Sequence, residues 1–105
     1  LTAGSGTSNL IALRSSSTYA NVPVDGTEYL SSTVFGGGDY ITGTSPYPYV
    51  EYDGGSTAIS ASGLSAGTTY TAAGFSFNGA SGSNNYYNST YPTTTFTTLA
   101  SHTTI

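Results

Sequence analysis

Short runs in which apolar and polar residues alternate recur along the chain, and most end at turn-forming residues. A period of two is typical of β-strands that bury one face. β-branched and aromatic residues outnumber good helix formers throughout, which nearly excludes helix. The pattern predicts strands over residues 9–14, 27–35, 47–52, 57–62, 70–77 and 91–99.

Glycine-containing pairs and triplets separate these runs and are able to supply turns with positive φ. They are Asp25-Gly26, Gly36-Gly37-Gly38, Asp53-Gly54-Gly55, Ala66-Gly67 and Asn78-Gly79. Short strands at this spacing predict an all-β antiparallel sandwich or barrel. Residues 80–90 are expected to form a long surface connection. We expect the domain to cover residues 1–99, and residues 100–105 to be a linker or an exchanged tail.

The composition raises disorder as an alternative. Ser, Thr and Gly make up nearly half of the chain, and Leu, Ile, Val and Phe fall below the roughly 20% at which disorder becomes a serious interpretation. Disorder usually needs high net charge or many Pro, Glu and Lys residues, and the chain has neither. Ten tyrosines supply further apolar area, since each large aromatic residue buries roughly 150–250 Å². We therefore expect a folded domain with a thin core.

Charge excludes some classes of partner. The chain has one Lys or Arg against five Asp or Glu, a net charge of −4, so no nucleic-acid partner is expected. No apolar run approaches the roughly 20 residues that span a bilayer, so no membrane insertion is expected. The absence of cysteine excludes disulfides and thiolate chemistry. A composition rich in Ser, Thr, Gly, Asn and Tyr, and a start at Leu1, suggest a secreted, processed product or a fragment.

The run Leu-Ser-Ala-Gly-Thr-Thr-Tyr at 64–70 resembles the Leu-x-Pro-Gly-Thr-x-Tyr corner of fibronectin type III domains. The resemblance implies that Leu64, Gly67 and Tyr70 form a structural corner, in which the tyrosine hydroxyl bonds back to the upstream backbone. The following strand with its Asn-Gly exit, and residues 22–27 and 57–64, are similar to a version repeated in bacterial secreted surface proteins. Together these imply an immunoglobulin-like antiparallel sandwich.

Several positions depart from that family's pattern. Residues 1–6 resemble the end of its second strand, so the opening strands are expected to be missing or supplied by a neighbour. Ala72 and Gly74 fall where the family has bulky side chains, and Glu51 interrupts an apolar strand. Either these positions face outward or the domain is marginal alone. We hypothesise that neighbouring copies complete the sheet through residues 93–105 by β-augmentation. The alternative is that the chain is part of a longer protein.

No catalytic residue is predicted. His102 is the single histidine and lies in a polar tail, where nothing holds it as a triad base must be held. Glu51 and Asp53 would share a strand face, and a glycosidase needs two carboxyl groups roughly 5–10 Å apart. A small sandwich rarely provides the deep cleft that such an enzyme requires.

No metal site or cofactor is predicted either. Asp25, Glu28, Asp39 and Asp53 suggest calcium, which prefers several oxygen ligands. However, Asp-Gly is first of all a turn signal, and the spacing of a calcium loop is lacking.

Tyrosines are the candidate binding residues. Exposed tyrosines stack on sugar rings or anchor protein partners at low entropic cost. The candidates flank two prolines or lie in or beside the 80–90 connection, and they are Tyr47, Tyr49, Tyr86, Tyr87 and Tyr91. The alternative is that most tyrosines belong to the core or the corner. Residues 88–90 also form a glycosylation sequon.

These observations predict a non-catalytic extracellular structural or adhesive module, as a repeat or a subunit of a surface fibre. Its expected partners are copies of itself or adjacent domains, because low charge permits close packing of copies. The alternative function is a carbohydrate-binding accessory domain of a secreted hydrolase, with glycans as partners.

Overall fold

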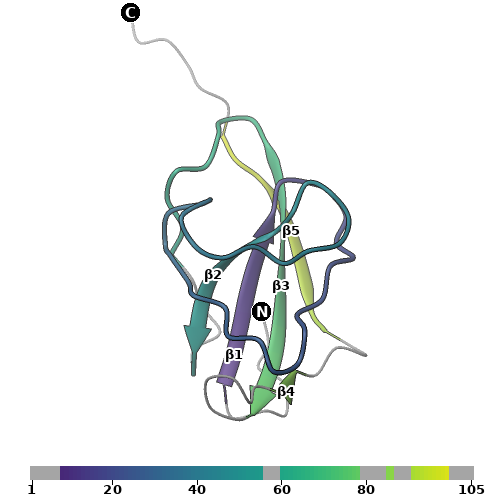
Figure 1. The fold of residues 1–105 in the computed structure, drawn as a ribbon. Coiled ribbons are helices and arrows are strands. Elements are labelled where there is room, and N and C mark those ends of the chain that lie inside the picture. The colour runs from purple at the N-terminus through teal and green to yellow at the C-terminus, as the bar shows by residue number, and fades with distance from the viewer. Residues whose placement is uncertain (1–7, 56–59, 79–84, 87–90, 100–105) are drawn as a thin grey trace, which may run out of the picture.

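The computed structural model describes residues 8–55, 60–78, 85–86 and 91–99. These residues contain no helix, and their strands form one antiparallel sheet (Figure 1). Its members are β1 (Ser8–Arg14), β2 (Tyr49–Gly54), β3 (Thr69–Asn78), β4 (Asn85–Tyr86) and β5 (Thr93–Thr97). The order is β2-β1-β3, and both β4 and β5 pair with the far side of β3. The predicted all-β, sandwich-like class is confirmed.

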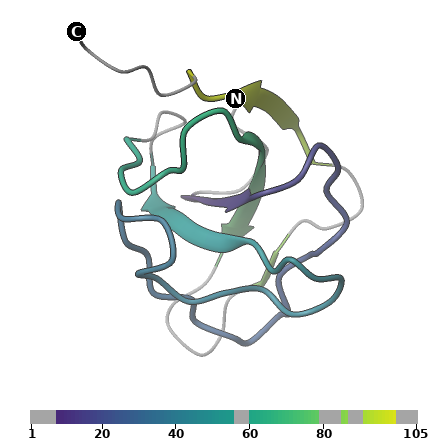
Figure 2. The ribbon, with the colours of Figure 1, turned by 90° about the horizontal axis from the view of Figure 1, so that it is seen from above.

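Strand β1 is the centre of the sheet because it is apolar on both faces. Leu10, Ile11, Ala12 and Leu13 are all at most 1% exposed, as is typical of a strand covered from both sides. Figure 2 shows the two covers when the sheet is viewed along its strands: most of the 15–48 segment lies on one side, and residues 60–68 lie on the other, where residues 33–35 bond to them. Irregular segments, not a second regular sheet, therefore complete the layers in the described part of the chain.

The larger core lies under the 15–48 segment. Tyr29 and Ile41 of that segment are buried, and Tyr19 and Val22 pack against them. The sheet contributes alternate residues of three strands, which share this face: Leu10, Ala12, Val50, Ala73, Phe75 and Phe77. Since stabilisation by burial grows with the apolar surface removed from water, this cluster contributes more than the smaller one.

The smaller core lies on the opposite face. Leu13, Tyr70 and Ala72 are buried there, and Phe35, Ala61 and Leu64 pack on them. Bulky residues of β1 compensate for the small residues that the sequence places on this face, because Ala72 lies opposite Leu13 and Gly74 lies opposite Ile11.

Arg14, the chain's one cation, joins the 15–48 segment to the sheet. It is only 4% exposed, and its guanidinium donates to three backbone carbonyls. Nε donates to Pro46 O at 2.8 Å, Nη1 to Thr18 O at 2.7 Å and Nη2 to Ser45 O at 3.1 Å. A planar fork of donors suits this task better than an ammonium group does.

The predicted strand over residues 27–35 is wrong. Its backbone groups make single bonds to a turn and to β2, with Leu30 O accepting from Asp39 N–H and Val50 O accepting from Ser32 N–H. Only Val34 forms a bridge, to Ser62. The alternation here anchors two separate residues, Tyr29 in the larger core and Phe35 against the smaller one, and leaves Leu30 64% exposed.

Two further predictions differ from the structure or fall outside it. In the expected strand over 57–62, residues 57–59 lie outside the described residues. The expected surface connection over 80–90 contains a short strand, β4, which pairs with Phe77 and Asn78 of β3. A two-residue strand carries too little alternation to be recognised in the sequence.

Glu51 does not face outward. A bulge in the β1–β2 pairing lies at this position, and the Glu51 side chain is 3% exposed with no hydrogen-bond partner for either carboxylate oxygen. Burial raises its pKa to about 7.

Candidate binding surface

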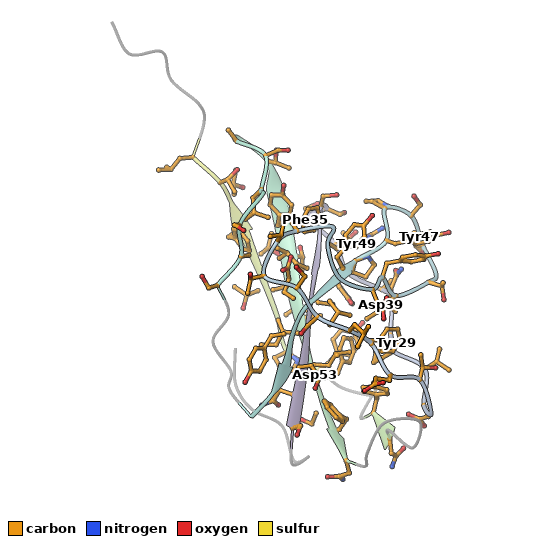
Figure 3. All side chains as sticks on the ribbon, turned by 60° about the vertical axis from the view of Figure 1, so that its left-hand side comes forward. Tyr29, Phe35, Asp39, Tyr47, Tyr49 and Asp53 are labelled. Carbon is orange, nitrogen blue, oxygen red and sulfur yellow. The ribbon has the colours of Figure 1, made fainter. Side chains whose placement is uncertain are left out.

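Six aromatic rings run across the molecule in unbroken contact. Tyr47 stacks on Tyr40, which touches Tyr49, and Tyr49 in turn meets Phe35 with centroids 5.2 Å apart. Figure 3 shows Phe35, Tyr49 and Tyr47 following one another across one end of the sheet. Beyond Phe35 the series continues through two more rings, Tyr70 and Phe96.

The outer end of this series is a surface feature. Tyr40 is 50% exposed and Tyr47 is 41% exposed, with their centroids 5.3 Å apart and an angle of 12° between the planes. Tyr49 holds Tyr40 from the side, at 6.4 Å and 72°. The exposed aromatic surface is thus kept in one orientation by its neighbours.

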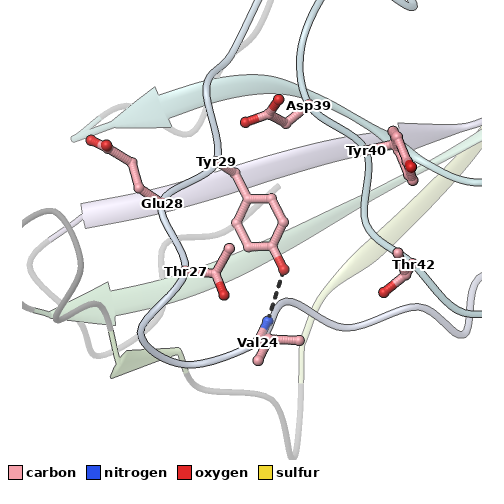
Figure 4. A pocket seen from close by; sticks show the side chains of 7 residues that line it. All are labelled: Val24, Thr27, Glu28, Tyr29, Asp39, Tyr40 and Thr42. Carbon is pink, nitrogen blue, oxygen red and sulfur yellow. Dashed lines mark hydrogen bonds between the residues drawn. The ribbon is translucent and has the colours of Figure 1, made fainter.

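A pocket of about 370 Å³ opens beside Tyr40. Figure 4 shows its two walls, residues 24–29 on one side and residues 39–42 on the other, with the ring of Tyr29 between them. Tyr29 is 7% exposed, and its hydroxyl accepts a hydrogen bond from Val24 N–H at 3.0 Å. We refer to this feature as the Tyr29–Tyr40 pocket.

Each wall of the pocket is fixed to a strand. On one side, Val50 N–H donates to Asp39 O at 2.8 Å and Ile41 N–H donates to Pro48 O at 2.9 Å. On the other side, Asp25 Oδ1 accepts from Tyr86 N–H, and Thr27 O accepts from the Tyr86 hydroxyl at 2.7 Å. Gly26, with φ 80°, allows the turn between these two contacts.

The tyrosines predicted to bind a partner differ in how far they are buried. Tyr47 is exposed, and Tyr49 is half-buried between Tyr40 and Phe35. Tyr86 is only 6% exposed, and its pKa is raised by burial and then by Asp53. Tyr86 is therefore a core residue, not a surface residue. Tyr91 packs against Phe75 at 4.6 Å.

Tyr87 lies outside the described residues, as do the 88–90 sequon and His102. Tyr40, Val24 and Thr42 were not recognised in the sequence as candidate binding residues. Tyr40 meets Tyr47 only because the chain turns back between them, and no periodic pattern encodes such a contact.

Two of the predicted acidic residues cap backbone groups. Asp25 accepts from Tyr86 N–H and Asp39 Oδ2 accepts from Leu30 N–H, both at 2.8 Å. The pKa of Asp53 is raised by burial and then by Glu28. Within the described ranges, no group of three or more His, Cys, Asp or Glu side chains is placed to hold a metal ion.

The corner around residues 64–70 has the expected geometry. Ser65 N–H donates to the Tyr70 hydroxyl at 2.9 Å, and Gly67 takes φ 61°, a conformation in which glycine has no steric penalty. Gly67 N–H donates to Leu99 O at 3.0 Å, and Leu64 packs on Tyr70's cluster. The corner therefore ties the entry of β3 to the end of the β5 segment.

One side of β5 is open in the described structure. Thr98 N–H donates to Thr68 O and Gly74 N–H donates to Pro92 O. In an antiparallel ladder, backbone groups of successive residues point alternately toward and away from the partner strand. The N–H and C=O groups of Thr93, Thr95 and Thr97 therefore point away from β3, and all five residues of β5 are exposed.

Comparison with protein-family models, curated proteins and solved structures found no match to this chain. The described residues contain no helix of the length and apolarity that a membrane crossing requires.

Proposed function

We propose that this chain is a non-catalytic structural module of an extracellular assembly, and that a second copy of the chain adds to the sheet at the open edge of β5. The observation that carries the proposal is the outward row of backbone groups at Thr93, Thr95 and Thr97. Unpaired strand edges template further pairing unless they are protected.

The edge lacks the usual protection. Proteins block such edges with lysine, proline, inward charges or bulges, whereas β5 contains only threonine and one phenylalanine. Pro92 lies just before the strand, and its backbone faces β3, so it does not interrupt the outward backbone groups of Thr93, Thr95 and Thr97. All five acidic residues and the arginine lie between residues 14 and 53. Two β5 edges therefore meet without charge repulsion between their own side chains.

Pairs of threonine side chains already link β5 to β3. The hydroxyls of Thr69 and Thr97 are 2.9 Å apart, and those of Thr71 and Thr95 are 3.0 Å apart. Such cross-strand pairs contribute roughly 0.2–1 kcal/mol each. The strand's outer side offers the same chemistry to an identical strand, which makes the contact self-complementary.

The fibronectin type III-like design is part of the proposal. The order β1-β3-β5, with a bonded tyrosine corner before β3, is that of the three-stranded CFG sheet of immunoglobulin-like sandwiches. This order and the Ser65–Tyr70 bond support the resemblance. Low charge and few sites for trypsin support an extracellular setting.

Sedimentation velocity over a concentration series tests the edge. Thr95→Pro removes one outward N–H without removing a backbone hydrogen bond to β3, although the hydroxyl pair with Thr71 is lost. Proline is tolerated on the free side of an edge strand. Thr93→Lys places a charge on the same edge. We expect the unmodified chain to self-associate and both variants to remain monomeric at the same concentrations.

Thr33→Lys is the matched control, because it adds the same charge at an exposed threonine of the 15–48 segment, outside β5. It should associate like the unmodified chain, and circular dichroism should show the same β-content for all four proteins. A monomeric unmodified chain at about 1 mM, or edge variants that associate normally, would contradict the proposal.

A further inference from the structure

The Tyr29–Tyr40 pocket combines an exposed aromatic ring with several hydrogen-bonding groups that have capacity to spare. We propose that it binds a neutral saccharide unit, with Tyr40 against the sugar ring and Asp39, Thr42 and the Tyr29 hydroxyl bonded to sugar hydroxyls. The inference goes beyond the structural role and does not depend on it. The residues that would bind the sugar, Tyr40, Asp39 and Thr42 among them, differ from the tyrosines that the sequence indicated.

The aromatic part of the site is pre-organised. Tyr40 is half exposed, yet its ring is held by stacking on Tyr47 and by the edge of Tyr49. Aromatic rings present an apolar face at a low cost in conformational entropy, and prior ordering lowers the cost of binding further. The C–H face of a sugar ring is the matching surface.

The polar part of the site has unused donors and acceptors. The buried Tyr29 hydroxyl accepts from Val24 N–H, and no described residue accepts its proton. Asp39 uses one carboxylate oxygen for Leu30 N–H, which leaves the other for a ligand. The Thr42 hydroxyl lines the pocket as well. Sugar hydroxyls donate and accept at the same atom, and therefore suit this mixture.

Charge and size select the class of sugar. Asp39 and Glu28 both line the pocket, while the only cation, Arg14, is buried in bonds to carbonyls elsewhere. An anionic sugar would meet like charge with no cation to compensate. A volume of about 370 Å³ lies at the lower end of the roughly 300–1,000 Å³ range of ligand pockets. The pocket therefore fits one or two neutral units of a longer chain.

The test is a two-dimensional NMR titration of the ¹⁵N-labelled chain with cellohexaose, xylohexaose, mannohexaose, maltohexaose and chitohexaose, each to about 10 mM, well above the millimolar Kd that corresponds to weak binding. Hexagalacturonate is the anionic comparison. We expect at least one neutral oligosaccharide to shift amides within residues 24–42, and hexagalacturonate to leave them unchanged.

Variants then assign the contact to the pocket. We expect Tyr40→Ala to raise the Kd at least tenfold and Asp39→Asn, whose amide oxygen still accepts from Leu30 N–H, to raise it severalfold. Asp53→Asn removes an acidic charge outside the pocket and should bind normally. No shift with any neutral sugar, shifts outside residues 24–42, or a Tyr40→Ala variant with unchanged affinity would each overturn the inference.

The two proposals fail separately. Tyr40→Ala leaves β5 intact, so it should self-associate like the unmodified chain, and Thr93→Lys should bind the oligosaccharide like the unmodified chain.

Discussion

The hydroxyl of Tyr70 accepts a hydrogen bond from the backbone N–H of Ser65, five residues earlier, over 2.9 Å. The Tyr70 ring is buried at 2% exposure and touches Phe35 and Phe96. One side chain therefore fixes both the turn that enters β3 and the smaller core.

Removal of this hydroxyl should loosen the corner without disturbing the ring. We expect Tyr70→Phe to lower the free energy of unfolding by about 1 kcal/mol, the net value of a typical protein hydrogen bond. Tyr47→Phe is the control, because the ring of Tyr47 is 41% exposed and its hydroxyl has no such role. Urea denaturation measures both variants. Equal midpoints for the two would show that the Ser65 bond contributes nothing.

Gly38 lies where the backbone comes closest to itself. A Cβ at this position would stand 2.5 Å from Val50 O and 2.9 Å from Leu30 O. Both atoms belong to the backbone that joins the pocket wall to β2, so neither can rotate away. We expect Gly38→Ala to destabilise the chain by about 2 kcal/mol, within the range for overpacking.

Gly55→Ala is the matched control, since a Cβ there has no neighbour within 4 Å. It should leave the thermal unfolding temperature unchanged or raise it slightly through the reduced entropy of the unfolded chain. A Gly38→Ala variant as stable as Gly55→Ala would show that the 30–50 region shifts freely.

The sequence predicts the strands that bury alternate residues against partners, and it fails where contacts are made by single side chains. β1, β2, β3 and β5 lie within or close to the predicted runs, although β1 is buried on both faces and β5 is exposed throughout. Residues 27–35 show the same alternation, but there it serves only to anchor Tyr29 in the larger core and Phe35 against the smaller one. Since a strand and an anchored loop place one residue inward in the same way, the pattern alone cannot distinguish them.

The candidate site is even less visible in the sequence. Of the five predicted binding tyrosines, Tyr47 lies at the exposed surface next to the pocket, while Tyr86 is in the core. Tyr40 and Asp39 come to the pocket because their backbone pairs with residues 48–50. That pairing depends on the tertiary course of the chain, which no periodic pattern in the sequence encodes.

Arg14 provides a test of how the 15–48 segment is held. Its guanidinium makes bonds to Thr18 on one side and to Ser45 and Pro46 on the other. Lysine cannot reproduce this fork, so we expect Arg14→Lys to lower the free energy of unfolding by about 2 kcal/mol, as for loss of hydrogen bonds to a charged group.

The partners of Arg14 are three carbonyls and the Thr18 hydroxyl, and no carboxylate of the described residues bonds to it. The effect of Arg14→Lys should therefore be the same in low salt and in 1 M salt, since screening weakens ion pairs between exposed charges. A difference between variant and unmodified chain that disappears at high salt would indicate an ion pair instead.

Glu51 should make the domain more stable in mild acid than above neutral pH. Burial raises its pKa from 4.5 to about 7, so between these values the folded chain keeps a proton that the unfolded chain has lost. Stability therefore falls as the pH rises through this window and is lowest above it. We expect a loss of about 2 kcal/mol between pH 5 and pH 8, since each pKa unit is worth about 1.4 kcal/mol.

Glu51→Gln cannot ionise, so urea denaturation at pH 5 and pH 8 should give nearly equal free energies of unfolding for this variant. Asp53, whose pKa is also raised by burial and by Glu28, contributes a slope of the same sign. Glu28→Gln, a change at an exposed glutamate, should keep the loss between pH 5 and pH 8. If Glu51→Gln keeps it as well, the pH dependence arises from another group, and the carboxyl at the bulge is solvated in the folded state.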